Sequence, residues 1–266
     1  MQPLVSILVL TYNHEEFIVE AIESALNQTY SNFEIVISDD CSTDNTIDIL
    51  TNFQLKYPEK IKVINSNLNL GVTANHNRAL VNSIGEYVCF MGGDDILLPD
   101  KVSQQVDFML NVPDCEISYH NLEVFDSYSN KFLYYFNDKN TPRNGNVLMS
   151  ILFGTFNGAC GTMVKRKKEL LFDERILLAS DWYFWIENLA KGGKILFIDK
   201  VLSRYRKHNS SVSSSTPSNK AFYERAQTLY YSSFKYPYLA IFCLISLIRF
   251  GVIELALRVK FFLIVK

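Results

Sequence analysis

The fold of this chain is decided by an N-terminal stretch, Val5-Ser-Ile-Leu-Val-Leu-Thr-Tyr-Asn13, in which an almost wholly apolar run ends in polar residues. A short aliphatic and β-branched run closed by turn-forming residues is typical of a buried strand. Three similar runs follow at residues 33–38, 61–65 and 87–91, and helical patterns separate the four. This alternation predicts an α/β protein with a mainly parallel central sheet and helices on both faces.

Helices are predicted where apolar residues recur at helical spacing. The first is expected directly after Asn13, because Asn13 and Glu16 resemble a capping box before the apolar stripe of residues 17–26. Further helices are expected at residues 44–56, 72–82, 101–111 and 181–191, a hairpin at 117–135, and a strand at 194–198. The repeated β-α pattern thus occupies the first hundred residues and loosens beyond Asp100.

Composition narrows the class of protein. Hydrophobic residues make up 48% and charged residues 20% of the chain, which excludes a disordered protein. The formal net charge of −2 excludes strong sequence-independent binding to nucleic acid, because such binding needs a basic surplus. The five cysteines are scattered without a C-x-x-C motif, and no basic segment precedes the first apolar run. We therefore expect reduced thiols, no secretory signal and a cytoplasmic location.

The C-terminal part differs from the rest of the chain. We predict a main domain of residues 1–213, then a C-terminal helical segment of residues 214–266 that starts within a Ser-rich loop at 210–218. Residues 236–248 carry no charge, but this run is shorter than the ~20 residues that span a bilayer. Later charges fall on two opposite faces of the predicted helix, unlike a clean interfacial helix. We favour peripheral membrane contact or partner docking, and packing of the helix on its own domain remains the alternative.

Polar side chains follow three of the predicted strands, at the point where each strand ends. Residues 11–13 follow the first strand, Asp39 and Asp40 follow the second, and Asp94 and Asp95 follow the fourth. The carboxyl ends of parallel strands share one edge of the sheet, so these groups should gather there. Clustered carboxylates raise one another's pKa unless a cation offsets them. Because the chain lacks glycine-rich phosphate-binding motifs, this edge predicts Mg²⁺ or Mn²⁺ held by Asp94 and Asp95, with substrate phosphates completing the shell.

The motifs around these residues resemble a known family. The stretches Val5-Ser-Ile-Leu-Val-Leu-Thr-Tyr-Asn13, Ala25-Leu-Asn-Gln-Thr-Tyr30 and Glu34-Ile-Val-Ile-Ser-Asp-Asp-Cys-Ser-Thr-Asp44 are similar to the opening of the family 2 inverting glycosyltransferases of bacterial surface-polysaccharide type, which have the GT-A fold. The motifs that continue the resemblance in the same order are Asn69-Leu-Gly71, Gly85-Glu-Tyr87, Gly93-Asp-Asp95, Phe172-Asp-Glu174, Ser180-Asp-Trp182 and Tyr205-Arg-Lys-His208. The likeness covers about residues 3–213.

The resemblance implies a nucleotide-sugar site along the first two strands. Thr11, Tyr12 and Asn13 would line the nucleotide. Asp40 would hydrogen-bond the ring of a uracil or thymine, and Asp39 would support it.

The resemblance also implies positions for the metal and the chemistry. Asp95 would hold the metal, and Asp94 would contact the donor ribose or sugar. Asp181 would be the general base. Arg206 and His208 would reach the diphosphate or the metal from late in the chain, with His208 as a candidate metal ligand.

Three positions depart from the family pattern. Gly92 stands where the family usually has the first Asp of the metal motif, and His76, although at a nucleotide-sugar-binding position, replaces the usual Arg. Ser180 replaces the carboxylate before the base. The other histidines discussed here, His14 and His120, are interpreted as structural.

The implied function is metal-assisted, inverting transfer of a sugar from a UDP- or dTDP-sugar to a hydroxyl of a glycan or lipid-linked acceptor. We expect it at the inner face of the cell membrane, in surface polysaccharide synthesis. A nucleotidyltransferase is a weaker alternative, because no Lys or Arg occurs before Lys56 to bind a triphosphate. A non-catalytic nucleotide-sugar or partner-binding module is the other alternative, suggested by Gly92 and His76.

Overall fold

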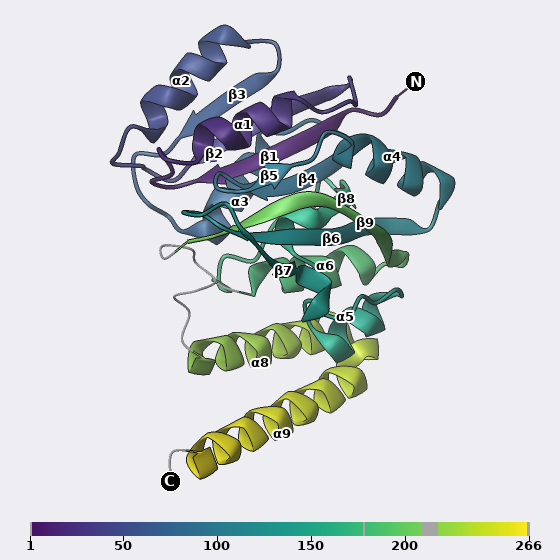
Figure 1. Cartoon of the computed structure of the whole chain (residues 1–266). Helices are drawn as coiled ribbons and strands as arrows, with labels where there is room; N and C mark the ends of the chain where they lie inside the picture. The colour runs from purple at the N-terminus through teal and green to yellow at the C-terminus, as the bar shows by residue number, and fades with distance from the viewer. Residues whose placement is uncertain (1, 178, 209–217, 265–266) are drawn as a thin grey trace.

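The computed structural model of this chain describes residues 2–177, 179–208 and 218–264, except for the side chains of residues 218–221 and 253–264. Among the described residues, nine strands form one mixed sheet with the order β3-β2-β1-β4-β8-β6-β9-β5, and β7 pairs with β6 at the side (Figure 1). The strands of the parallel part are β1 (Val5–Thr11), β2 (Phe33–Asp39), β3 (Ile61–Asn65) and β4 (Tyr87–Gly92). The predicted α/β fold with a central sheet is confirmed.

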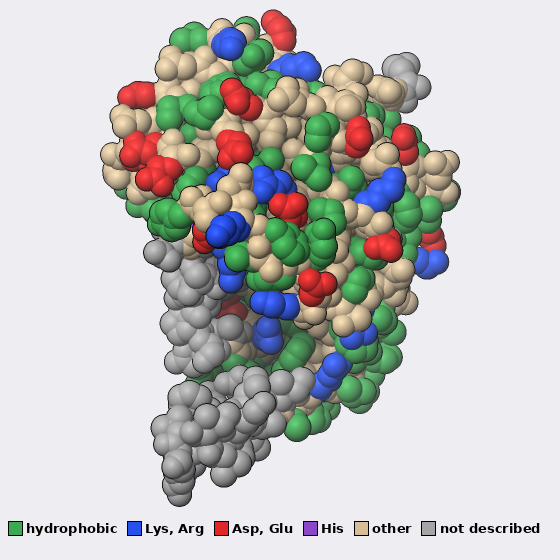
Figure 2. All heavy atoms as spheres, in the orientation of Figure 1, with side chains coloured by type: hydrophobic (Ala, Val, Ile, Leu, Met, Phe, Trp, Pro, Cys, Tyr) green, Lys and Arg blue, Asp and Glu red, His purple; other side chains and the backbone are tan. Residues whose placement is uncertain are grey.

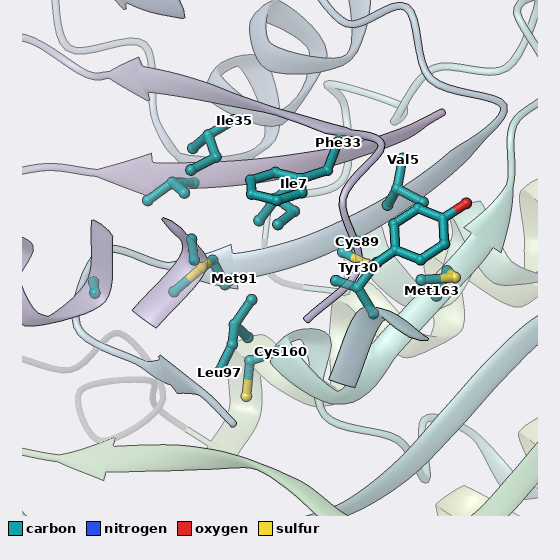
Figure 3. Close-up of a cluster of buried hydrophobic side chains, with 14 of the residues drawn as sticks. Val5, Ile7, Tyr30, Phe33, Ile35, Cys89, Met91, Leu97, Cys160 and Met163 are labelled. Carbon is teal, nitrogen blue, oxygen red and sulfur yellow. The ribbon is translucent and has the colours of Figure 1, made fainter. Parts of the chain in front are cut away.

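Alternate residues of the strands face two hydrophobic cores. Val5, Ile7 and Val9 of β1 point to one face, and Figure 3 shows Val5 and Ile7 among side chains of neighbouring strands. This face is covered by α1 (Ile18–Leu26), α2 (Thr46–Lys56) and α4 (Lys101–Asn111). The other face, which includes Leu8, is covered by α3 (Val72–Val81), α5 (Val147–Phe153) and α6 (Ser180–Leu189). A parallel sheet covered on both faces explains why its strands are apolar on both sides.

The predicted capping box at the first helix is wrong. Helix α1 begins at Ile18 without a side-chain cap. Asn13 instead adopts a left-handed backbone conformation with φ of 53°. Its side-chain oxygen accepts a hydrogen bond of 2.8 Å from the backbone N–H of Thr43. Asn13 therefore joins the loops after β1 and β2, a partnership between distant residues that local spacing does not reveal.

The second half of the sheet combines two long strands, β6 and β9, with three short ones. They are β5 (Ile96–Leu97), β6 (Cys115–Asp126), β7 (Phe132–Tyr135), β8 (Thr162–Lys165) and β9 (Lys194–Lys207). The predicted hairpin is confirmed as the antiparallel pair β6 and β7. Strand β9 continues well beyond the predicted end at residue 198, because it pairs with β6 up to Lys207 and with β5. This extension carries the chain back to the acidic edge.

The C-terminal segment forms two helices below the sheet, α8 (Ser218–Lys235) and α9 (Ala240–Ile264), as Figure 1 shows. Helix α8 packs on α6, and α9 packs on α5 and α8. The C-terminal helices therefore pack on their own domain, which was the alternative considered for this segment. The predicted Ser-rich loop and the boundary at residue 213 lie outside the described residues. In the part of the chain that is described, none of the helices combines the length and apolarity needed to cross a membrane.

Candidate active site

The acidic strand ends meet at the carboxyl edge of β2, β1 and β4. Thr11 lies directly opposite Asp39, and Leu10 lies opposite both Ser38 and Gly92. The parallel register therefore places the three polar strand ends side by side, as the sequence predicts. Thr11 is buried and its hydroxyl oxygen lacks a hydrogen-bond partner among the described residues. Tyr12 is 44% exposed, so its ring is accessible to a ligand at this edge.

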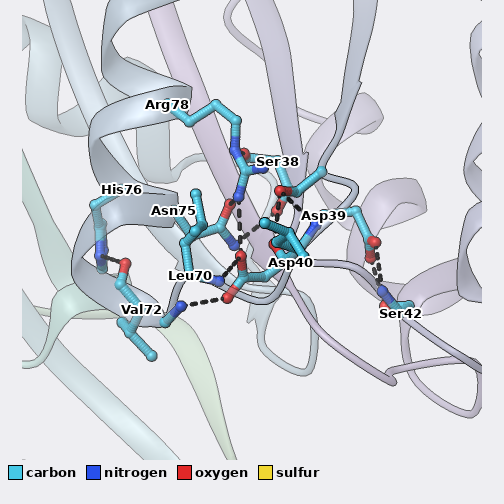
Figure 4. Close-up of polar contacts among 12 residues, drawn as sticks. Ser38, Asp39, Asp40, Ser42, Leu70, Val72, Asn75, His76 and Arg78 are labelled. Atoms are coloured by element: carbon cyan, nitrogen blue, oxygen red, sulfur yellow. Dashed lines mark hydrogen bonds and ion pairs between the residues drawn. The ribbon is translucent and has the colours of Figure 1, made fainter.

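Asp39 holds the turn that follows β2. Its carboxylate accepts hydrogen bonds from the backbone N–H and the hydroxyl of Ser42, at 2.8 and 2.5 Å (Figure 4). Ser42 in turn accepts a hydrogen bond from the backbone N–H of Asn13. The turn includes Cys41, whose φ of 68° is unusual for a residue with a side chain. Asp39 thus shapes this loop from inside the protein.

Asp40 organises the start of α3. Its two oxygens accept hydrogen bonds from the backbone N–H groups of Leu70 and Gly71, at 3.0 and 2.7 Å, and form an ion pair of 3.0 Å with Arg78 (Figure 4). Arg78 also donates to Ser38 and Asn75. A carboxylate offers about four lone-pair positions, so three are already used here. Asp40 is therefore first a structural clamp between the end of β2 and the start of α3.

His76 and Arg78 divide the role expected of the usual arginine in this helix. His76 stacks on Phe172 with ring centroids 4.5 Å apart, and its Nδ1 lies 3.0 Å from the carbonyl oxygen of Val72. Burial lowers the pKa of His76 to about 4, so it is neutral at physiological pH. Arg78, which we did not single out from the sequence, supplies the fixed positive charge of this region. The only signal for Arg78 in the sequence is its position two residues after His76 in the same helix.

Asp94 and Asp95 have contrasting surroundings. Burial raises the pKa of Asp95 well above its usual range, and the neighbouring Asp94 carboxylate adds to the rise. Burial acts on Asp94 in the same direction, but the hydrogen bond from His208 and the nearby His14 hold its pKa below the usual range. The Asp94 side chain occupies the space beside Gly92, since a Cβ on Gly92 would lie 2.3 Å from its Oδ1. Gly92 is thus required for this arrangement of Asp94.

Two histidines lie at this acidic turn. His208 Nε2 is 2.9 Å from Asp94 Oδ2, and the rings of His208 and His14 are 6.3 Å apart. His14, interpreted from the sequence as structural, lies beside Asp94 and His208. Its Nδ1 is buried and has no hydrogen-bond partner in the described part of the chain. Burial lowers the pKa of His14, so a neutral ring is favoured there.

Arg206 is directed into the protein and not toward open solvent. Its Nε donates to the carbonyl oxygen of Asp94 at 2.7 Å, its backbone N–H donates to Asp95 at 3.2 Å, and its guanidinium pairs with Glu20. The guanidinium also lies over the rings of Phe17 and Phe125. Arg206 thus fixes the Asp94–Asp95 turn from β9, a role that depends on Glu20 and that the sequence did not indicate.

The donor set at this turn fits a hard divalent cation. Two adjacent carboxylates, Asp94 and Asp95, match the few protein ligands that Mg²⁺ or Mn²⁺ takes when phosphates complete its shell. Within the described residues, no three His, Cys, Asp or Glu side chains form a preassembled metal cluster. His208, the other candidate ligand, contacts Asp94 in this arrangement.

Asp181 lies in the first turn of α6. Its Oδ1 accepts the backbone N–H of Trp182 at 2.7 Å. Burial raises the pKa of Asp181 to about 6, whereas its backbone hydrogen bonds act in the opposite direction. The segment that leads to α6 is fastened to α3, because Thr73 donates to the carbonyl oxygen of Ile176 at 2.9 Å and Asn77 donates to that of Phe172 at 3.0 Å. Asp181 is thereby tied to the helix that Asp40 positions.

The aromatic residues beside Asp181 serve mainly as core. Trp182, Phe184 and Trp185 are at most 3% exposed, and Phe184 stacks on Phe172 with centroids 4.2 Å apart. Tyr183 instead lines a cavity of about 760 Å³ between α6 and α8. The other residues lining it are Glu169, Leu170, Leu171, Asp173, Arg175, Glu187, Tyr230, Tyr231, Phe234 and Lys235. None of the acidic strand-end residues lines this cavity, so it is separate from the edge of the sheet.

Comparison with known proteins gives consistent matches. Residues 6–171 match the model of glycosyl transferase family 2. The chain is 34% identical over 220 residues to the Escherichia coli protein WfaP, named as a UDP-Glc:α-D-GlcNAc-diphosphoundecaprenol β-1,3-glucosyltransferase, and the match covers 79% of this chain and 80% of WfaP. It is 28% identical over 214 residues to Bacillus subtilis TuaG, whose name refers to teichuronic acid biosynthesis, over 80% of this chain and 82% of TuaG.

Solved structures share the fold at lower sequence identity. Residues 1–349 of Staphylococcus aureus TarS, in complex with UDP-GlcNAc, superpose with a TM-score of 0.67 at 22% identity. That match covers 85% of this chain and 65% of the TarS chain, so this chain spans just under two thirds of it. The family match over most of the chain and the WfaP similarity together establish that this protein belongs to glycosyl transferase family 2 and is a glycosyltransferase with the GT-A fold.

Proposed function

We propose that this enzyme transfers a sugar, with inversion, from a UDP- or dTDP-sugar to a hydroxyl group of a glycan or lipid-linked acceptor in surface polysaccharide synthesis. The observation that carries the proposal is an acidic edge, with Asp39 and Asp40 at the end of β2 and Asp94 and Asp95 after β4, together with Asp181 in the first turn of α6, whose pKa is raised to about 6. WfaP supports the donor and acceptor classes, because its name specifies UDP-Glc and a diphosphoundecaprenol-linked sugar. We place the reaction at the cytoplasmic face of the membrane, where such a lipid-linked acceptor would be met.

The chemistry follows from the side chains at hand. The Asp181 carboxylate takes the proton of the acceptor hydroxyl, and the acceptor oxygen attacks the anomeric carbon from the side opposite the leaving nucleoside diphosphate. The bond from the anomeric carbon to the diphosphate oxygen breaks, so the configuration is inverted. A pKa of about 6 leaves Asp181 ionised at neutral pH and keeps it more basic than an ordinary Asp.

The donor is held by the two acidic pairs. Asp39 and Asp40 would position the loops that contact the base, with Tyr12 against its face. A divalent cation held by Asp94 and Asp95 would neutralise the charge that develops on the leaving diphosphate. Arg206 and Glu20 keep these two carboxylates in place. His208 would orient Asp94, so its proposed contact with the metal is secondary.

Nucleotide binding tests the donor class and the cation together. We expect calorimetry to detect binding of UDP or dTDP but not of GDP or CDP. Full affinity for the bound nucleotide should require Mn²⁺. In Asp95→Asn the dependence on Mn²⁺ should be lost, whereas Asp107→Asn, an exposed carboxylate on α4, should behave as the wild type. Selection of GDP, or a wild-type affinity that Mn²⁺ leaves unchanged, would contradict the proposed donor and cofactor.

A further inference from the structure

The cavity of about 760 Å³ between α6 and α8 has an aromatic side. Its volume falls within the range of small-molecule sites, ~300–1,000 Å³. Tyr230 and Phe234 of α8 line it and are 64% and 81% exposed. Because they are four residues apart in one helix, their rings are neighbours on the same side of α8. Two largely exposed rings beside a cavity form a platform for an apolar surface of a ligand.

The charged residues of the same cavity neutralise one another. Each of the five that line it forms an ion pair, the pairs being Glu187–Lys235, Asp173–Arg175 and Glu169–Lys191. Glu187, whose side chain is 4% exposed, is the most deeply placed of them. An ionic ligand would therefore meet no unmatched counter-charge in this lining. Paired carboxylates and cations still keep some hydrogen-bonding positions, which hydroxyl groups can use.

The rest of the molecule adds little attraction for an ionic ligand. The formal net charge is −2, and acidic and basic side chains are interspersed over the face drawn in Figure 2. Both cations of the cavity lining are engaged by carboxylates, so the diphosphate of a nucleotide sugar would find no free cation among these residues. The lining thus favours a neutral ligand that combines an apolar surface with hydroxyl groups.

The wall behind the exposed rings is already organised. The guanidinium of Arg175 lies over the ring of Tyr231, 4.1 Å from its centroid, while it pairs with Asp173 at 2.5 Å. Gln227 donates to the Tyr231 hydroxyl at 3.1 Å and to the carbonyl oxygen of Arg175 at 3.3 Å. A wall whose side chains hold one another in place loses little conformational entropy when a ligand binds.

Helix α6 links this cavity to the proposed base. Tyr183 lines the cavity and lies two residues after Asp181 in the same helix. At 100° per residue the two side chains leave the helix on different sides. A ligand in the cavity is therefore held at a fixed place relative to Asp181, but on another side of α6 from its carboxylate.

We propose that this cavity is a saccharide-binding site for a neutral sugar unit of the acceptor glycan. The apolar C–H face of the sugar ring would stack on Tyr230 and Phe234, and its hydroxyls would hydrogen-bond to the ion pairs. The inference deepens the proposed function and rests on it for the source of the glycan, because it names where a unit distant from the reacting hydroxyl is held. A charged protein segment is a poorer fit, since the lining offers it no free charge to match.

Ligand-observed saturation-transfer NMR on the full chain tests this site. The ligands are neutral tetrasaccharides of glucose, galactose and N-acetylglucosamine, each with α and with β linkages, and one sulfated tetrasaccharide for comparison. Wild type should bind at least one neutral tetrasaccharide and bind the sulfated one more weakly. Tyr230→Ala/Phe234→Ala should raise the Kd by about tenfold or more, because both stacking rings are lost. The matched control Tyr128→Ala/Phe132→Ala removes an exposed Tyr and an exposed Phe elsewhere and should bind as the wild type.

Other outcomes would overturn the proposal. They are wild type that binds none of the neutral tetrasaccharides, a double variant with an unchanged Kd, and tighter binding of the sulfated ligand. Sedimentation equilibrium that shows a wild-type dimer and a monomeric double variant would assign the two rings to a second copy of the chain.

Saccharide binding can be separated from sugar transfer, because it needs neither the donor nor the cation. Asp181→Asn should bind the tetrasaccharide with the wild-type Kd. Binding by a wild-type protein that transfers no sugar would contradict the proposed function and support the saccharide site. Transfer by a wild-type protein that binds no tetrasaccharide would contradict the saccharide site alone.

Discussion

The carboxylates at the two sides of the site differ in how completely their hydrogen-bonding capacity is used. On the side of β2 and α3, Asp39 and Asp40 together accept five hydrogen bonds from Ser42, Leu70, Gly71 and Arg78. Asp181, by contrast, accepts a backbone N–H and lies in surroundings that raise its pKa to about 6. A saturated carboxylate stabilises a loop, whereas an undersolvated one retains basicity for proton transfer. This comparison distinguishes the carboxylates that hold loops in place from Asp181, which we propose as the general base.

The largest effect on the transfer rate is expected for Asp181, the carboxylate with few hydrogen-bond donors around it. Asp181→Asn should lower kcat by about 10²–10⁴-fold, the usual contribution of a general base. Donor affinity, measured by calorimetry, should stay unchanged, because Asp181 lies on α6 and not at the strand ends. Asp48→Asn is the matched control, since Asp48 is an exposed Asp in the first turn of α2. Equal activities for the two variants would reduce Asp181 to an ordinary helix-start residue.

The pH dependence of transfer should report the same group. The base acts as the carboxylate, so kcat/KM should be flat above the pKa of Asp181, about 6, and fall toward tenfold per unit below it. Donor affinity should be followed by calorimetry over the same range, to separate binding from proton transfer. If the residual activity of Asp181→Asn kept the same inflection, the titrating group would be a different one.

A smaller effect, on stability, is expected for the ion pair of Arg78 with Asp40, whose carboxylate is already hydrogen-bonded on most sides. Arg78→Gln leaves Asp40, whose side chain is 5% exposed, without its cation. We expect the free energy of unfolding in urea to fall by about 2 kcal/mol, because a partly buried carboxylate loses its charged partner. Lys194→Gln removes a cation from an exposed pair with Asp114 and should cost at most about 0.5 kcal/mol. Equal losses in both variants would mean that the Asp40 clamp is no stronger than a surface ion pair.

Much of the fold could be predicted because its signals are local. The four apolar runs and their polar ends are short-range patterns, and parallel pairing alone brings Thr11, Asp39 and Gly92 to one edge. The errors arose where the partner is distant. Asn13 resembles a helix cap but bonds to Thr43, and the place of His14 beside Asp94 and His208 is not visible in the sequence. Spacing along the chain carries no information about such contacts.

The sequence by itself determined the class of fold, the acidic edge and the candidate base, since strand periodicity and strand-end polarity depend on neighbouring residues. Tertiary structure alone decided which carboxylates are saturated and which remain basic. The Arg78–Asp40 pair, the Arg206–Glu20 pair and the burial of Asp181 each join elements that are far apart in the chain. The pKa of a carboxylate depends on the donors and the burial around it, and packing creates both.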